Sequence, residues 1–248
     1  MTTGDLGKDV FEATYAVPMH CESCTNDIRS CLDVIPGVED LSFDLKQQML
    51  SVNGTAPPSS IIKALQKCGR DAIIRGTGKP NSSAVSILET FEKIDLKKDT
   101  PVRGLARIVE VGDKKTFFDI TLNGVPYKGK YFASIHESGD ISEGVASTGA
   151  VWHRFEEPID CQEPSDLDPK LYSGHAFLKA PVSVWELIGR SFVVTADESN
   201  HTGPNSNGEY CGVIARSAGV WENDKQVCAC SGKSIWQERK DALRNNIK

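Results

Sequence analysis

The chain has 248 residues, of which 39% are hydrophobic and 25% charged, a balance typical of globular proteins. Its 28 basic and 34 acidic residues give a net charge of -6, which argues against nucleic-acid binding. No apolar run approaches the roughly 18 residues of a membrane span, and residues 1–10 lack the apolar stretch of a secretory signal. We therefore expect one or two full domains, with or without a small appendage, in the cytosol and without stable membrane insertion.

Residues 1–75 show the pattern of a small α+β domain. Apolar residues alternate with polar ones, or recur at helical spacing, in six successive segments: 11–17 (strand), 24–35 (helix), 41–45 and 50–52 (a hairpin), 58–68 (helix) and 72–74 (strand). Pro18 ends the first strand, and Pro36-Gly37 and Gly69 end the two helices. The order β-α-β-β-α-β predicts a ferredoxin-like fold.

A change of composition follows this domain. Residues 76–83 have the Gly, Pro and Ser content of an exposed linker, so we place a domain boundary there. Residues 84–220 contain short β-like segments such as 102–111 with little helical periodicity, which predicts a β-sandwich or β-barrel. The stretch 137–180 is long, polar and rich in Gly, Ser and Pro, so we expect a functional loop excursion or a disordered segment there.

The last segment, residues 221–248, is a tail that is too short to fold alone. It carries Cys228-Ala-Cys230, followed by a pattern that predicts one short helix over 235–243. Thiols one residue apart on a strand point to opposite faces, so closing a ring between them strains the backbone. A strained disulfide is oxidising and exchanges quickly. Taken alone, Cys-x-Cys is a weak motif, for which chance or half of a zinc site is the usual explanation.

A second pair of thiols lies near the N-terminus in the motif Met19-His-Cys21-Glu-Ser-Cys24. The motif joins a strand to the start of a helix, where the helix dipole favours thiolates. Two soft sulfurs select Cu(I) and leave room for an incoming third ligand, whereas zinc would require four ligands. Cys21 and Cys24 are therefore candidate copper ligands. The alternatives are a thioredoxin-like redox pair or a chance spacing.

This motif, on the first loop of a β-α-β-β-α-β unit, resembles the heavy-metal-associated domain of copper chaperones and copper ATPases. The resemblance places Arg70 near the metal, where its charge would balance a copper dithiolate; an ordinary solvated arginine is the alternative. Cys31 and Cys68 lie on the apolar faces of the two predicted helices, which pack side by side in that fold. A disulfide between them and two buried free thiols are both compatible with the sequence.

Three strings in the middle of the chain resemble Cu/Zn superoxide dismutase: GKYFASIHESGD (129–140), GRSFVVT (189–195) and CGVIAR (211–216). The resemblance spans about 84–220 and implies a Greek-key β-barrel. The copper ligands of that family are missing, because Ser134 and Thr195 stand at two of its histidine positions. His153 is left to stand for the bridging ligand, and we interpret His153, His175 and His201 most simply as surface residues of polar loops.

The same resemblance implies that a dismutase dimer face survives on this barrel. We assign Trp185, Gly189, Arg190, Val213 and Arg216 to it. A self-complementary face accepts any partner that presents the same patch, so the barrel is suited to a heterodimer with intact Cu/Zn superoxide dismutase, or to a homodimer. The family's disulfide partner of Cys211 is missing near Val145, and a bond between Cys161 and Cys211 is conceivable.

The order of copper domain, dismutase-like barrel and Cys-x-Cys tail resembles the copper chaperones for superoxide dismutase, particularly the yeast forms. The resemblance implies that Cys21 and Cys24 acquire Cu(I), that the barrel docks on immature dismutase, and that Cys228 and Cys230 insert the metal and form the target's disulfide. It implies a cytoplasmic protein, with the mitochondrial intermembrane space as a second compartment, and leaves the copper donor unknown. A thiol-disulfide oxidoreductase with incidental copper, and a dismutase fused to its own copper carrier, are the rival hypotheses.

Overall fold

The computed structural model describes residues 10–76, 82–91, 101–165, 167–197 and 208–217. The predicted tail, with Cys228 and Cys230, and His201 lie outside these residues. Within the described part, no helix is long and apolar enough to cross a membrane.

The N-terminal unit has the ferredoxin-like arrangement that the sequence predicts. Its elements, in chain order, are β1 (Phe11–Ala16), α1 (Glu22–Leu32), β2 (Val38–Asp44), β3 (Met49–Gly54), α2 (Pro58–Lys67) and β4 (Ile73–Gly76). The strands form an antiparallel sheet in the order β2-β3-β1-β4. Tyr15, Leu50 and Ile61 are fully buried between this sheet and the helices, which explains why apolar residues recur at strand and helix spacing in the sequence.

The second unit is an eight-stranded antiparallel barrel that resembles the superoxide dismutase fold, as predicted. Its elements are β5 (Ser83–Glu89), β6 (Val102–Gly112), β7 (Lys115–Val125), β8 (Gly129–His136), β9 (Val151–Arg154), β10 (Ile159–Pro164), β11 (Tyr172–Ala180), α3 (Val184–Leu187), β12 (Ser191–Ala196), β13 (Glu209–Val213) and β14 (Ala215–Arg216). The ring runs β10-β11-β7-β6-β5-β13-β12-β8 and closes by pairing of β8 with β10. β9 and β14 extend it. The connections from β7 to β8 and from β11 to β12 pass between non-neighbouring strands, which is the Greek-key feature.

The stretch 137–180 is not a single loop excursion, and our expectation for it was wrong. It contains β9, β10, β11 and a short 3₁₀ helix, η2 (Gly144–Ser147). In β11, Ala176, Leu178 and Ala180 point into the core, while the alternate residues face outward. Only one face of these strands is apolar and the flanking turns are rich in Gly and Pro, so composition hid the period of two.

The predicted linker, 76–83, begins and ends within strands. β4 includes Gly76 and β5 starts at Ser83, while residues 77–81 lie outside the described part.

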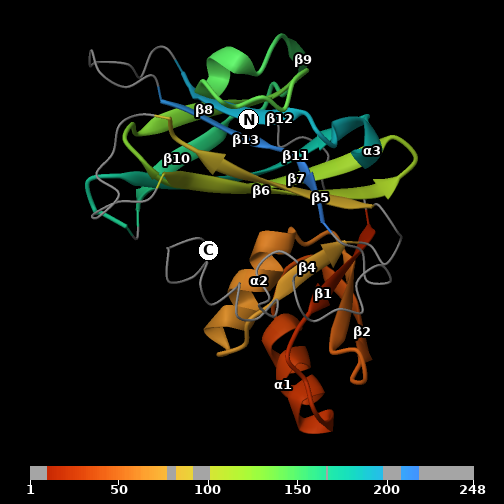
Figure 1. The fold of residues 1–248 in the computed structure, drawn as a ribbon. Helices are drawn as coiled ribbons and strands as arrows, with labels where there is room; N and C mark the ends of the chain where they lie inside the picture. Colours follow the sequence, from red (N-terminus) through yellow and green to blue (C-terminus); the bar gives the residue numbers. More distant parts are fainter. Residues whose placement is uncertain (1–9, 77–81, 92–100, 166, 198–207, 218–248) are drawn as a thin grey trace.

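The first unit lies against the barrel (Figure 1), and the two units share a hydrophobic cluster. Phe11, at the start of β1, packs against Phe117 of β7 and Phe177 of β11, with ring centroids 5.1 and 6.0 Å away. Phe117 and Phe177 stack at 4.9 Å. β1 therefore starts at the barrel and leads away from it, over about 20 Å at the usual rise per strand residue. The loop that follows β1 lies at the end of the first unit that faces away from the barrel.

A disulfide joins Cys31 of α1 to Cys68, directly after α2, with a Cα–Cα distance of 6.5 Å. It is the first of the two alternatives that the sequence left open. The bond ties together the two helices on one side of the sheet, and Cys68 is exposed at the surface.

We expect the double variant Cys31→Ser/Cys68→Ser to lower the free energy of unfolding of the first unit by about 4 kcal/mol, because the bond closes a long loop in the unfolded chain. Denaturant-dependent amide exchange of α1 and α2 would measure this, with barrel amides as the internal reference. Adding a reductant should destabilise the wild type and leave the double variant unchanged. Equal protection of α1 and α2 in both proteins would contradict a stabilising role for the bond.

Candidate metal site and docking face

The thiols of Cys21 and Cys24 converge on the loop between β1 and α1. Cys21 precedes the first residue of α1, and its carbonyl accepts hydrogen bonds from the N–H groups of Cys24 and Thr25, at 3.0 and 3.4 Å. The two Sγ atoms lie 3.9 Å apart. Cys21 is exposed and Cys24 half-buried, whereas Met19 of the same motif is fully buried in the core. The start of α1 thus brings both sulfurs together at the surface, while the buried Met19 side chain holds the loop to the core.

The environment of Cys24 stabilises its thiolate. Hydrogen bonding to the backbone of His20 has the largest effect and lowers the pKa of Cys24, burial comes second and raises it, and contacts with Cys21 and then with the Arg70 side chain lower it further. The resulting pKa is about 7. A large fraction of Cys24 is therefore already deprotonated at neutral pH, as metal binding by a thiol requires.

Arg70 lies beside this loop, as the family resemblance implies. Its guanidinium forms an ion pair with Asp27 of α1 at 2.9 Å and donates to the carbonyl oxygen of Pro18 at 3.3 Å. These contacts tie the segment after α2 to both sides of the metal loop. They also hold a positive charge close to the two sulfurs, where it stabilises anionic ligands.

This geometry suits a soft ion that is bound and then released. With metal–sulfur bonds of about 2.3 Å, sulfurs on opposite sides of an ion would lie about 4.6 Å apart. The observed 3.9 Å therefore needs only a small opening of the loop. No group of three or more His, Cys, Asp or Glu side chains that could hold a metal occurs in the described residues. The two sulfurs thus form an incomplete, solvent-accessible ligand set.

The barrel position that would carry copper in a dismutase is closed by hydrogen bonds. His136 Nε2 lies 3.1 Å from the Ser134 hydroxyl, and its Nδ1 lies 2.8 Å from the Thr148 hydroxyl and 3.1 Å from the Gly149 carbonyl. Burial lowers the pKa of His136, which favours the neutral ring. Both ring nitrogens are engaged, and Thr195 on β12 offers no nitrogen ligand.

Two other histidines are on strands rather than in the polar loops that we expected. His153 is in β9, half-buried, with its ring edge-on to Phe155 at 4.9 Å, and His175 is exposed on β11. These positions follow from the strands within 137–180, which the composition of that stretch concealed.

Cys161 and Cys211 are not bonded to each other. Both are free and buried, and desolvation raises the pKa of each thiol to about 12. Buried, protonated thiols are chemically inert. Among the free cysteines that the structure describes, reactive sulfur is therefore confined to the loop of Cys21 and Cys24.

Three of the five residues assigned to the docking face, Gly189, Arg190 and Val213, lie together on the barrel surface. The N–H of Gly189 donates to the carbonyl of Ile214, next to Val213, and the N–H of Ile214 donates to the carbonyl of Arg190. Arg190 lies over the Trp152 ring at 4.4 Å. Trp185 is 72% exposed and Val213 37%, and Gly189 and Arg216 are also exposed.

Sequence reasoning missed further apolar residues that are exposed beside this region. Ile87 of β5 is 42% exposed next to Gly212, and Val151, the neighbour of Trp152, is also 42% exposed. Ile87 was detectable in principle, because it occupies the outward position of an alternating strand and is nevertheless apolar. Like Trp185 and Val213, these residues are large apolar side chains exposed on the barrel, the kind of residue found in protein interfaces.

Fold and site together define a class of protein, a two-thiol metal carrier fused to a dismutase-like barrel whose described residues form no metal site. Comparison with known proteins agrees. Residues 14–71 match the heavy-metal-associated domain family.

Relatives over nearly the whole chain are named superoxide dismutase 1 copper chaperone. The chain is 65% identical to the one from Candida glabrata over 240 residues, 97% of this chain and 98% of that protein. It is 63% identical over 254 residues to the one from Saccharomyces cerevisiae, which covers both chains fully, and 59% identical to the one from Kluyveromyces lactis, which covers 96% of each. This chain belongs to the family of copper chaperones for superoxide dismutase, whose members are chaperones rather than enzymes.

We expect alkylation of Cys24 to follow a titration with a midpoint near pH 7, slowing below it as the thiolate is protonated. Mass spectrometry of the labelled peptide measures this, and Cys161 and Cys211 in the folded protein should remain unlabelled under the same conditions. Arg70→Ala should move the midpoint to higher pH, because it removes a hydrogen bond to the thiolate. The control Lys67→Ala removes an equal charge from the end of α2, and an identical shift in both variants would contradict a specific role for Arg70.

Proposed function

We propose that this protein acquires Cu(I) at Cys21 and Cys24, delivers it to Cu/Zn superoxide dismutase, and promotes the target's disulfide by thiol-disulfide exchange. The observation that carries the proposal is the exposed sulfur pair, 3.9 Å apart, on a chain whose dismutase-like barrel has lost its metal ligands. A carrier benefits from an incomplete ligand set, because a third ligand from the recipient can enter and draw the ion away. The relatives' name supports the same client.

Recognition of the client is assigned to the exposed apolar region around Trp185 and Val213. The intact enzyme has a self-associating barrel of the same fold, so this face would pair with one dismutase subunit in a heterodimer. A homodimer of the chaperone through the same face is the alternative, and would compete with client binding.

Delivery itself is assigned to the tail. Because β1 leads away from the barrel, the loop between β1 and α1, which carries Cys21 and Cys24, lies at the end of the first unit far from the barrel and its proposed docking face (Figure 1). A second thiol pair, Cys228 and Cys230, would bring the ion across as a dithiol. As a disulfide, the same pair would oxidise the client: a client thiolate attacks it, a mixed disulfide forms, and the second client thiol displaces the tail, which is reduced as the client is oxidised.

The rival function is a thiol-disulfide oxidoreductase with incidental copper. It predicts that the metal-free chain oxidises the client's cysteines as well as the loaded chain does. The cytoplasm is our proposed location, with the mitochondrial intermembrane space as a second one. Cys21 and Cys24 need a reducing compartment, whereas the Cys31–Cys68 bond needs an oxidising step.

We expect Cys228→Ser/Cys230→Ser to abolish client activation while leaving copper binding at the first loop intact. Cys21→Ser/Cys24→Ser should impair activation mainly when copper is scarce. Superoxide turnover of purified apo-dismutase, measured after mixing with each variant at limiting and excess Cu(I), separates the two roles. Equal loss in copper excess for the Cys21/Cys24 variant would mean that the first domain does more than acquire the metal.

We also expect Trp185→Ala to weaken the complex with apo-dismutase by about 2 kcal/mol or more, because large aromatic residues dominate interface energies. This corresponds to roughly a 30-fold rise in Kd, measurable by titration calorimetry. Val34→Ala is the matched control, since Val34 is 76% exposed on the first domain. An unchanged Kd for Trp185→Ala would exclude this face as the docking site.

A further inference from the structure

A buried carboxylate connects the two units of the fold. Asp119 lies on β7 of the barrel, almost completely buried, and its Oδ2 accepts a hydrogen bond of 2.6 Å from the N–H of Ser59. Ser59 is the second residue of α2, so its N–H is one of those that the helix itself leaves without an acceptor. The barrel thus supplies the acceptor for a helix of the copper-carrying domain, and the helix dipole favours a negative group there.

Residues from both units surround this carboxylate. The guanidinium of Arg107 on β6 lies 3.8 Å from Asp119 and donates to Thr121 at 3.4 Å. From the other unit, the hydroxyl of Tyr15 on β1 is buried and close enough for the charge of Asp119 to raise the pKa of Tyr15, after the larger effect of burial. Within the described residues, the Tyr15 hydroxyl and Asp119 Oδ1 have no hydrogen-bond partner.

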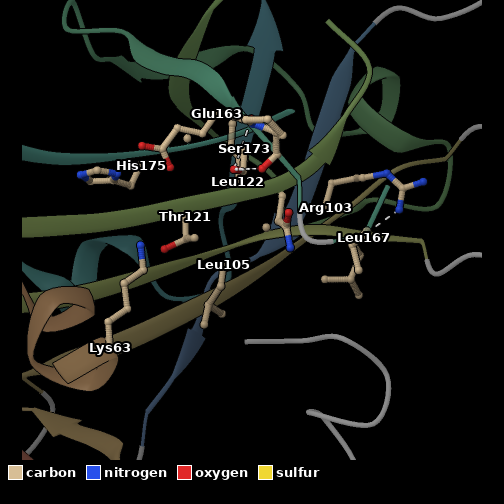
Figure 2. A pocket seen from close by; sticks show the side chains of 14 residues that line it. Lys63, Arg103, Leu105, Thr121, Leu122, Glu163, Leu167, Ser173 and His175 are labelled. Atoms are coloured by element: carbon tan, nitrogen blue, oxygen red, sulfur yellow. Dashed lines mark hydrogen bonds between the residues drawn. The ribbon is translucent and has the colours of Figure 1, made fainter. Parts of the chain in front are cut away.

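The rest of the contact between the two units, which we call the seam, is apolar on one side and borders a cavity on the other. Phe11, Phe117 and Phe177 fill the first side. On the second, Lys63, one turn beyond Ser59 on α2, borders a cavity of about 190 Å³ (Figure 2). Across it lie the side chains of Thr121 and, farther along the barrel wall, His175. Packing along this stretch of α2 is therefore incomplete.

We propose that Asp119 is a positioning residue that holds the copper-carrying domain in one orientation on the barrel. Apolar contacts such as those of the Phe11 cluster are non-directional and tolerate sliding. The buried carboxylate is directional, because any rotation of the domain that withdraws the Ser59 N–H leaves a charge in the interior without its donor. The Ser59 N–H is therefore paired with Asp119 Oδ2 only while the two domains keep this arrangement.

The position of the Asp119–Ser59 contact on the barrel also affects where the loop of Cys21 and Cys24 lies. In the closed ring, β7 and β11 lie across the barrel from β12 and β13, next to which Gly189, Arg190 and Val213 are found. The Asp119 contact therefore fixes the first domain on the wall away from the docking face and directs Cys21 and Cys24 outward. The value of this arrangement for delivery rests on the proposed function, whereas the docking of the two domains does not.

The test is nitrogen-15 relaxation of the full chain, which reports whether the two domains tumble together. In the wild type, amides of α1 and α2 should show the same rotational correlation time as amides of β7 and β12. In Asp119→Ala the first domain should lose this common value and tumble faster, with the barrel's chemical shifts preserved. Asp119→Asn should restore common tumbling, because an amide oxygen still accepts from Ser59; a role in barrel folding alone would not produce this pattern.

A substitution in the first domain, on the other side of the seam, tests the docking without changing any residue of the barrel. Phe11→Ala removes a first-domain contact and should loosen docking only partly, since the Asp119 hydrogen bond remains. Asp160→Ala, an exposed acid on β10, is the matched control and should leave one correlation time. Two correlation times in the wild type, or a single one in Asp119→Ala, would overturn the proposal. Neither result depends on copper delivery, so the proposed function is tested separately.

Discussion

A metal ion that has to be handed to another protein cannot be held by a closed ligand shell, and this constraint organises the molecule. Two sulfurs at the start of α1 provide enough soft ligand to hold the ion and leave its remaining positions open. The pKa of Cys24, about 7, keeps the site ready to bind at neutral pH. The start of α1, the buried Met19 and the neighbouring Arg70 are the structural features that support this site.

The barrel shows the opposite arrangement. Its histidine at the former copper position has both nitrogens engaged by hydroxyl and carbonyl groups, and its free cysteines are buried and protonated. Among its described residues, the barrel therefore has no cluster of three or more side chains that could hold a metal. Under the proposed function, the exposed apolar residues near Trp185 recognise the client, so metal binding and client recognition are separated between the two units.

The contact between the units combines apolar packing with one directional bond. The aromatic cluster around Phe11 supplies contact area, and the carboxylate of Asp119 supplies a requirement for one geometry. This division resembles the general behaviour of protein interiors, in which apolar burial provides most of the stabilisation and buried polar groups select among packings. A carrier whose loading loop and docking face point in different directions depends on such a selection.

The amino-acid sequence by itself determined the ferredoxin-like order, a β-sandwich or β-barrel and the Cys21/Cys24 motif, because these depend on local periodicity and on the identity of single residues. The choice of a barrel and the loss of the dismutase ligands followed from the resemblance of three sequence strings to a known family. Tertiary structure decided the rest. The strands within 137–180 have one polar face and gained their order from pairing with β7 and β8, and the disulfide of Cys31 and Cys68 depended on two helices coming together. The Asp119–Ser59 contact joins residues 60 positions apart in different domains, and no local pattern encodes it.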